Sequence, residues 1–220
     1  DVNKIKAILI THEHTDHIAG LRVFLKKHNV AVYSSEGTIN FLKSKGVMGE
    51  KNFSFILNSG KELDLKFASV IPFETSHDCA QGMGFVVNCP DGISFALCTD
   101  LGYISETIKN SILGCNAIMI ESNHDVMMLQ NGPYPYYLKR RILSDIGHLS
   151  NESCAQMLPS LVDKGAKNII LAHLSSHNNV PELAIQTGLA GLSNYGMKEK
   201  VDFNIFAAPK SNEDKFSCVV

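Results

Sequence analysis

The 220-residue sequence lacks several features that would each have pointed to a class of protein. No apolar run approaches the roughly 20 residues that span a bilayer, and no signal peptide opens the chain, which argues against membrane-spanning and exported proteins. The formal net charge is −2, so the chain is not basic throughout. Any contact with nucleic acid must therefore rest on a local patch of Lys and Arg.

The cysteines form no CxxC pair, and most of them lie in apolar runs: Cys79, Cys89, Cys98, Cys115, Cys154 and Cys218. This pattern predicts buried free thiols in a reducing compartment, so we expect a cytoplasmic protein. The chain begins at Asp1 without a methionine and reaches a strand almost at once. We therefore expect a piece of a longer protein.

Short β-rich runs alternate with helical patterns, without repeats or low-complexity tracts. Strands are predicted at residues 6–10, 30–35, 53–57, 62–67, 69–75, 83–89, 93–99, 117–122, 168–174 and 201–209. Helices are predicted at 18–28, 36–46, 135–147, 151–164 and 180–192. Strands that occur both in hairpins and between helices favour an α/β protein with mixed sheets, and the length suits a single domain, residues 1–220.

The densest polar stretch is THEHTDH (11–17), directly after an apolar strand. Side chains alternate along an extended segment, so His12 and His14 project to the same side. Asp16 and His17 fall where the chain turns into a helix. Two pairs of ligands would then face two adjacent positions, and imidazole with carboxylate suits Zn, Mn or Fe. The alternative is a solvated polar loop with chance histidines.

Further ligands are expected at other strand ends, and three residues fit: His77, Asp100 and His173 each close an apolar run. Alone, each is typical of a capping or hydrogen-bonded residue. Together with the four residues of the first stretch they complete a seven-ligand set, in which the carboxylate of Asp100 could bridge two ions.

THEHTDH, SHD (76–78), TDLG (99–102) and AHLS (172–175) resemble, in order, the metal motifs of the metallo-β-lactamase fold. The resemblance implies that His12, His14 and His77 hold one metal, that Asp16, His17 and His173 hold the other, and that Asp100 bridges them. It also implies an αββα sandwich of two mixed sheets with the site at one edge. The strand hairpin that normally opens this fold is missing, so we expect an N-terminally truncated domain.

Three longer stretches narrow the resemblance: IESNHD (120–125), residues 132–152, and AHLSSHNN (172–179) are similar to the YycJ (WalJ, VicX) group. That group lies near tRNase Z and the PhnP phosphodiesterases. The resemblance implies a DNA exonuclease that acts from 5′ ends, with two divalent ions, Zn or Mn and conceivably Fe. The ions would activate a shared water as hydroxide for attack on phosphorus, and Asp16 would orient it.

The same stretches supply substrate-contact candidates. Arg140 and Arg141 belong to a cationic run whose guanidinium groups suit phosphate; the alternative is a solvated helix face. His148 lies on a loop where it could protonate the leaving oxygen, or simply cap a helix. His124 and Asn178 are further candidates, although an Asn pair also makes turns. Protein partners are not indicated.

The fold hosts several hydrolases, so other functions stay open. One alternative is a small cyclic phosphodiesterase of the PhnP kind, which a closed pocket would favour over an open groove. Another is a metal-binding regulatory module without catalysis, against which the complete ligand set argues.

Overall fold

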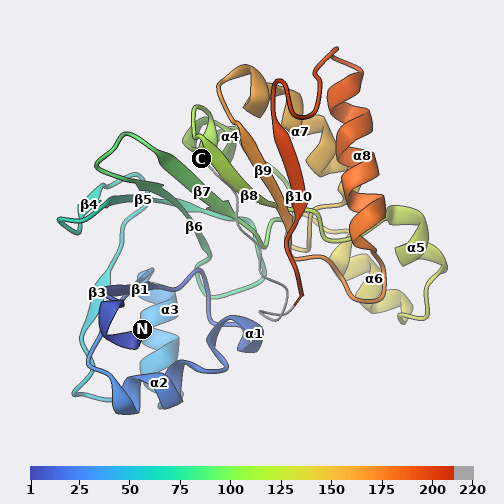
Figure 1. The fold of residues 1–220 in the computed structure, drawn as a ribbon. Coiled ribbons are helices and arrows are strands. Elements are labelled where there is room, and N and C mark those ends of the chain that lie inside the picture. The colour runs from blue at the N-terminus through green and yellow to red at the C-terminus, as the bar shows by residue number, and fades with distance from the viewer. Residues whose placement is uncertain (211–220) are drawn as a thin grey trace.

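The computed structural model describes residues 1–210, whose strands form a three-stranded and a seven-stranded sheet (Figure 1). Cys218 lies outside these residues. The strands are β1 (Ala7–Leu9), β2 (Ala31–Ser34), β3 (Ser54–Ile56), β4 (Leu63–Asp64), β5 (Ser69–Glu74), β6 (Met83–Asn88), β7 (Ser94–Cys98), β8 (Ala117–Glu121), β9 (Asn168–Ala172) and β10 (Asn204–Ala207). The helices are η1 (Val2–Lys4), α1 (Thr15–Ile18), α2 (Leu21–Lys27), α3 (Glu36–Ser44), α4 (Glu106–Ile112), α5 (Val126–Asn131), α6 (Tyr136–Ile142), α7 (Asn151–Asp163) and α8 (Pro181–Ser193).

The large sheet has the order β10-β9-β8-β7-β6-β5-β4 and is mixed. Its strands from β10 to β7 pair in parallel, whereas those from β7 to β4 pair antiparallel. The small sheet, β1-β2-β3, differs from the expected mixed pattern because both of its described pairs are parallel. The chain passes from β1 to β2 through α1 and α2, and from β2 to β3 through α3. Crossover connections of this kind leave neighbouring strands parallel.

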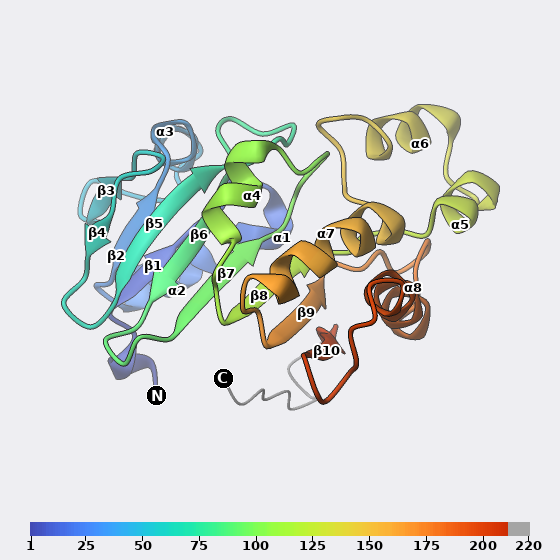
Figure 2. The same cartoon turned by 90° about the horizontal axis from the view of Figure 1, so that it is seen from above.

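The layers follow from where apolar side chains lie in the sequence. Strands β8 and β9 are nearly continuous apolar runs, because the sheet is covered on both faces. One core cluster joins this sheet to α4, α7 and α8, which lie across its outer face (Figure 2). A second cluster joins the small sheet to α2 and α3, and a third fills the space between the two sheets. The layers are therefore helices, small sheet, large sheet and helices, which is the predicted αββα sandwich.

Several helices differ from the sequence prediction. The helix expected at 18–28 is two helices, because Gly20 begins α2 as its N-cap and glycine weakens a helix interior. The helix expected at 135–147 ends at Ile142, where the chain folds back so that Gly147 lies against helix carbonyls. Helices α4 and α5 were not predicted, although Ser105 and Asp125 supply side-chain caps at their starts.

Strands of both sheets deliver their carboxyl ends to one region. β5 and β7 run in the same direction because each pairs antiparallel with β6, and β7, β8 and β9 are parallel neighbours. Beside this region the Met83 N–H donates to the Thr11 carbonyl at 3.0 Å, which ties the segment after β1 to the large sheet. No helix among residues 1–210 is both long and apolar enough to cross a membrane.

Candidate metal centre

Three histidines from two segments form the first group of potential ligands. His12 and His14 follow β1, and His77 follows β5. The Nε2 atom of His77 lies 3.2 Å from Nδ1 of His14, and the ring centroid of His12 lies 4.5 Å from that of His14 and 5.0 Å from that of His77. One nitrogen from each ring lies within 4.8 Å of the other two, and three imidazoles are a donor set that suits a divalent transition metal.

A second group consists of Asp16 and His17 in α1 and His173 directly after β9. The Oδ2 atom of Asp16 lies 3.6 Å from Nε2 of His17 and 3.7 Å from Nε2 of His173. Two imidazoles and a carboxylate again suit a divalent transition metal.

Asp100 lies between the two groups. Its Oδ1 atom is 3.8 Å from Nε2 of His77, and its Oδ2 atom is 3.5 Å from Nε2 of His17. The backbone at Asp100 and at His173 has φ of 61° and 58°, a left-handed conformation that non-glycine residues rarely adopt. Such strain costs of order 1–3 kcal/mol and persists at functional sites where the surroundings enforce it.

Hydrogen bonds hold the imidazole rings from behind. The Nδ1 atoms of His12 and His17 lie 3.1 and 3.2 Å from the hydroxyl oxygen of Thr11, and Nδ1 of His77 donates to the Gly147 carbonyl at 3.1 Å. Anchoring one ring nitrogen fixes the tautomer and leaves Nε2 free to act as a ligand.

Glu121, the last residue of β8, is fully buried and was missed by the sequence analysis. Its Oε1 atom accepts hydrogen bonds from Nδ1 of His173 at 2.6 Å and Nδ1 of His148 at 2.9 Å. Its Oε2 atom accepts from the backbone N–H of Leu101 and of Leu149. One carboxylate therefore holds the loops that carry Asp100 and His148 as well as the ring of His173.

The electrostatics of the site follow from burial and these hydrogen bonds. Burial and the charges of His17 and His14 lower the pKa of His12 to about 3, so His12 stays neutral and able to bind a cation. Burial acts to raise the pKa of Glu121, but the hydrogen bonds from His148 and His173 hold it at about 2. Burial acts to lower the pKa of His173, yet its bond to Glu121 raises it to about 9.

The donor set fits divalent metal ions. Nε2 of His12 and Oδ2 of Asp100 are buried and have no hydrogen-bond partner among the described residues. Buried polar atoms without a partner are costly, and a coordinated cation satisfies both. The groups open into a cavity of about 520 Å³ that is lined by Glu13, His14, Thr15, Asp16, Phe41, Asp100, Arg141, His148 and His173.

The other predicted residues divide into two sets. Arg141 and His148 line this cavity, as expected. Arg140 is exposed outside its lining, with its guanidinium 6.0 Å from the ring centre of Tyr136. His124 and Asn178 are each 1% exposed and also lie outside the lining. The structure thus does not bring Arg140, His124 and Asn178 to the cavity, because one side chain points away and two are packed into the interior.

A model of the β-lactamase superfamily domain matches residues 1–174. The chain belongs to this superfamily. It is 41% identical to the exodeoxyribonuclease YycJ of Bacillus anthracis over 184 residues, which cover 84% of this chain and 69% of that protein. It is 37% identical to the exodeoxyribonuclease WalJ of Streptococcus pneumoniae serotype 2, strain D39, over 92% of this chain and 76% of the relative.

Among solved structures, the metallo-β-lactamase fold protein YhfI of Bacillus subtilis superimposes with a TM-score of 0.70 at 15% identity. The alignment covers 94% of this chain and 76% of the other. At this identity the likeness shows the fold alone. These matches confirm the predicted metallo-β-lactamase fold and the resemblance to the YycJ group.

Proposed function

We propose that this chain is a metal-dependent phosphodiester hydrolase that removes nucleotides from the 5′ ends of DNA. The observation that carries the proposal is that seven metal-suited side chains lie together, with Asp100 between two groups, beside a cavity that is lined by four of them and by Arg141 and His148. The names of the two exodeoxyribonuclease relatives support DNA as the substrate.

The proposed ligands are those implied by the resemblance: His12, His14 and His77 for one ion, Asp16, His17 and His173 for the other, and Asp100 for both. Zn or Mn suits these donors, and Fe is also compatible with them. When bound, two such ions supply Lewis acidity toward a phosphoryl oxygen and lower the pKa of a coordinated water toward neutrality.

His148 is the proposed general acid. Its Nδ1–H donates to Glu121, so its Nε2 is the nitrogen available to the cavity. A proton on Nε2 can pass to the sugar oxygen as the bond to phosphorus breaks. Asp16, the most exposed member of the ligand set, is proposed to orient the attacking water as well as to hold metal.

Arg141 is the proposed phosphate contact. Its Nε and Nη2 atoms donate to the two carboxylate oxygens of Asp78, which follows His77 in the chain. This paired geometry leaves Nη1 free to donate to a non-bridging phosphate oxygen. Asp78 therefore acts as a positioning residue.

A cytoplasmic location is part of the proposal. The five cysteines of the described residues are free, as expected in a reducing compartment.

The test uses the purified protein loaded with Mn or Zn and duplex DNA labelled at one end. We expect stepwise shortening from the 5′ end, and loss of that activity in Asp16→Ala and His148→Ala. A 2′,3′-cyclic nucleotide is assayed in parallel. Cleavage of the cyclic nucleotide without DNA shortening would replace the proposal with the small-substrate alternative, and a loaded protein that cuts neither would refute it.

A further inference from the structure

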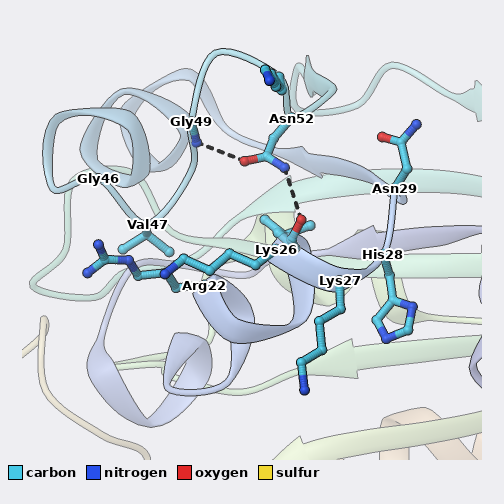
Figure 3. A pocket seen from close by; sticks show the side chains of 11 residues that line it. Arg22, Lys26, Lys27, His28, Asn29, Gly46, Val47, Gly49 and Asn52 are labelled. Carbon is cyan, nitrogen blue, oxygen red and sulfur yellow. Dashed lines mark hydrogen bonds between the residues drawn. The ribbon is translucent and has the colours of Figure 1, made fainter.

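A second cavity, of about 550 Å³, lies outside the metal centre at the carboxyl end of α2 (Figure 3). Its lining comes from two segments, α2 with the residues that follow it and the loop between α3 and β3. The lining residues are Arg22, Leu25, Lys26, Lys27, His28, Asn29, Gly46, Val47, Gly49, Lys51 and Asn52. The lining holds four permanent cations and no acidic residue.

The cations are not neutralised by carboxylates of residues 1–210. Arg22 and Lys26 are four positions apart on one face of α2 and extend to the same side in Figure 3. Like charges at this spacing repel each other and destabilise a helix. None of the four cations forms an ion pair with a carboxylate of residues 1–210. The nearby acid Glu50 is not among the lining residues.

The opposite wall of the cavity is held in place by Asn52. Its Oδ1 atom accepts from the Gly49 N–H at 2.8 Å, and its Nδ2 atom donates to the Leu25 carbonyl at 3.4 Å (Figure 3). Gly46, with φ of +64°, begins this loop in a conformation that suits glycine. The loop therefore lies over the end of α2 without any ligand.

Stabilisation of the end of α2 explains only some of the four cations. Lys26 and Lys27 lie in the last turn of α2, where cations stabilise the partial negative charge of the helix end. That effect fades within one turn, so it does not explain Arg22 in the first turn. Nor does it explain Lys51, which reaches the cavity from the other segment.

We propose that this cavity binds a backbone phosphate of the DNA substrate, away from the bond that is cut. The proposal rests on the proposed function. Asp16 lies in α1, and α2 follows directly with seven residues, or about 10 Å of helix. One strand of duplex DNA advances about 3.4 Å per nucleotide. A DNA strand that leaves the metal centre along α2 would reach the cavity after several nucleotides, and the cavity supplies a local patch of four cations on a chain of net charge −2.

The test compares the wild type with Arg22→Ala/Lys26→Ala and Lys27→Ala/Lys51→Ala. These residues are exposed and alanine favours helix, so the fold is expected to persist. Lys61→Ala/Lys198→Ala is the matched control, because both lysines are exposed, lie outside the cavities described here and form no ion pair with the described residues. Binding of a long oligonucleotide is measured by fluorescence anisotropy with EDTA over a range of salt, and thermal shift with inorganic phosphate is measured in parallel.

Each cavity variant should bind the oligonucleotide roughly tenfold more weakly. The slope of the logarithm of the binding constant against the logarithm of the salt concentration should be smaller in magnitude by about 1 to 2. With metal restored, hydrolysis of a dinucleotide should be unchanged while KM for the long oligonucleotide rises. If the wild type binds and cuts DNA and the cavity variants match the control, the cavity proposal alone is overturned. A phosphate-dependent thermal shift that only the cavity variants lose, with DNA binding intact, would overturn it in favour of a free anion. A wild type that neither binds nor cuts DNA would overturn the proposed function as well.

Discussion

Replacing Glu121 by Gln tests the most connected residue of the site. The carboxylate accepts hydrogen bonds from two histidines and from two backbone N–H groups. A glutamine side chain has only one oxygen. Its NH2 group must therefore face either the two histidines or the two backbone N–H groups. The lower-cost arrangement turns the NH2 toward His148 and His173, whose Nδ1 atoms must then give up their protons and accept.

That rearrangement has a calculable cost. Two hydrogen bonds to a charged acceptor, worth roughly 1.5–3 kcal/mol each, become neutral bonds worth about 1 kcal/mol. We expect a loss of about 1–4 kcal/mol in the free energy of unfolding. At roughly 2–4 °C per kcal/mol for a chain of this length, the Tm should fall by about 2–16 °C.

Metal binding should weaken through the same change. With Nδ1 of His173 acting as an acceptor, its proton moves to Nε2, the nitrogen that faces Asp16 and the proposed ion. Loss of such a supporting carboxylate typically lowers metal affinity by 10- to 100-fold. This loss of metal affinity is expected for the group of Asp16, His17 and His173. It is not expected for the group of His12, His14 and His77.

The assay combines calorimetry of the metal-free protein with chelator competition for Zn. Glu62→Gln is the control, because Glu62 is exposed and forms no ion pair with the described residues. It should change neither quantity. A Tm and a metal affinity for Glu121→Gln that equal those of the control would refute the role assigned to this carboxylate.

The remaining predictions concern His173, Gly102 and Arg141. The pKa of His173 is raised to about 9 by Glu121, so protons compete with metal: Zn affinity should fall as the pH is lowered from 9 to 7, and a flat chelator titration would contradict this. In the metal-free protein, the stabilisation from this pair is complete between about pH 4.5 and 6.5 and should be lost as the pH rises through about 9, which Tm measured against pH will show. Gly102→Ala would place a Cβ 2.0 Å from the Asp145 carbonyl oxygen; we expect a loss of about 1–3 kcal/mol in unfolding free energy, and an unchanged Tm would show that the loop adapts. Arg141→Lys should raise KM for DNA because a lysine cannot keep the paired carboxylate contact and still offer a phosphate donor; kinetics with an unchanged KM would remove this residue from the substrate contacts.

The proximity of the seven proposed ligands could be predicted from the sequence because its signals are local. Each of His77, Asp100 and His173 ends an apolar run, and parallel strands bring such ends to one edge of a sheet. The structure brings all seven predicted ligands together. Glu121 carries the same signal, since it ends the run of β8, but its role depends on partners 20 to 52 positions away in the chain.

Other features depended on packing that local patterns do not report. His124 and Arg140 are polar residues close to metal motifs, yet one is buried and the other is exposed outside the metal-centre cavity. The cationic cavity combines α2 with the loop between α3 and β3. Only the folded chain shows that Lys26 and Lys51 line the same cavity, because neither segment has a sequence pattern that indicates contact with the other.

We propose that seven residues hold two divalent ions at the edge of the sandwich. Anomalous diffraction from a crystal of the Zn-loaded protein, recorded at the zinc absorption edge, locates these ions. We expect two peaks about 3.5–4 Å apart, one among His12, His14 and His77 and one among Asp16, His17 and His173, with Asp100 between them. A Zn-loaded crystal with no peak among these residues, or with zinc bound elsewhere on the chain, would contradict it.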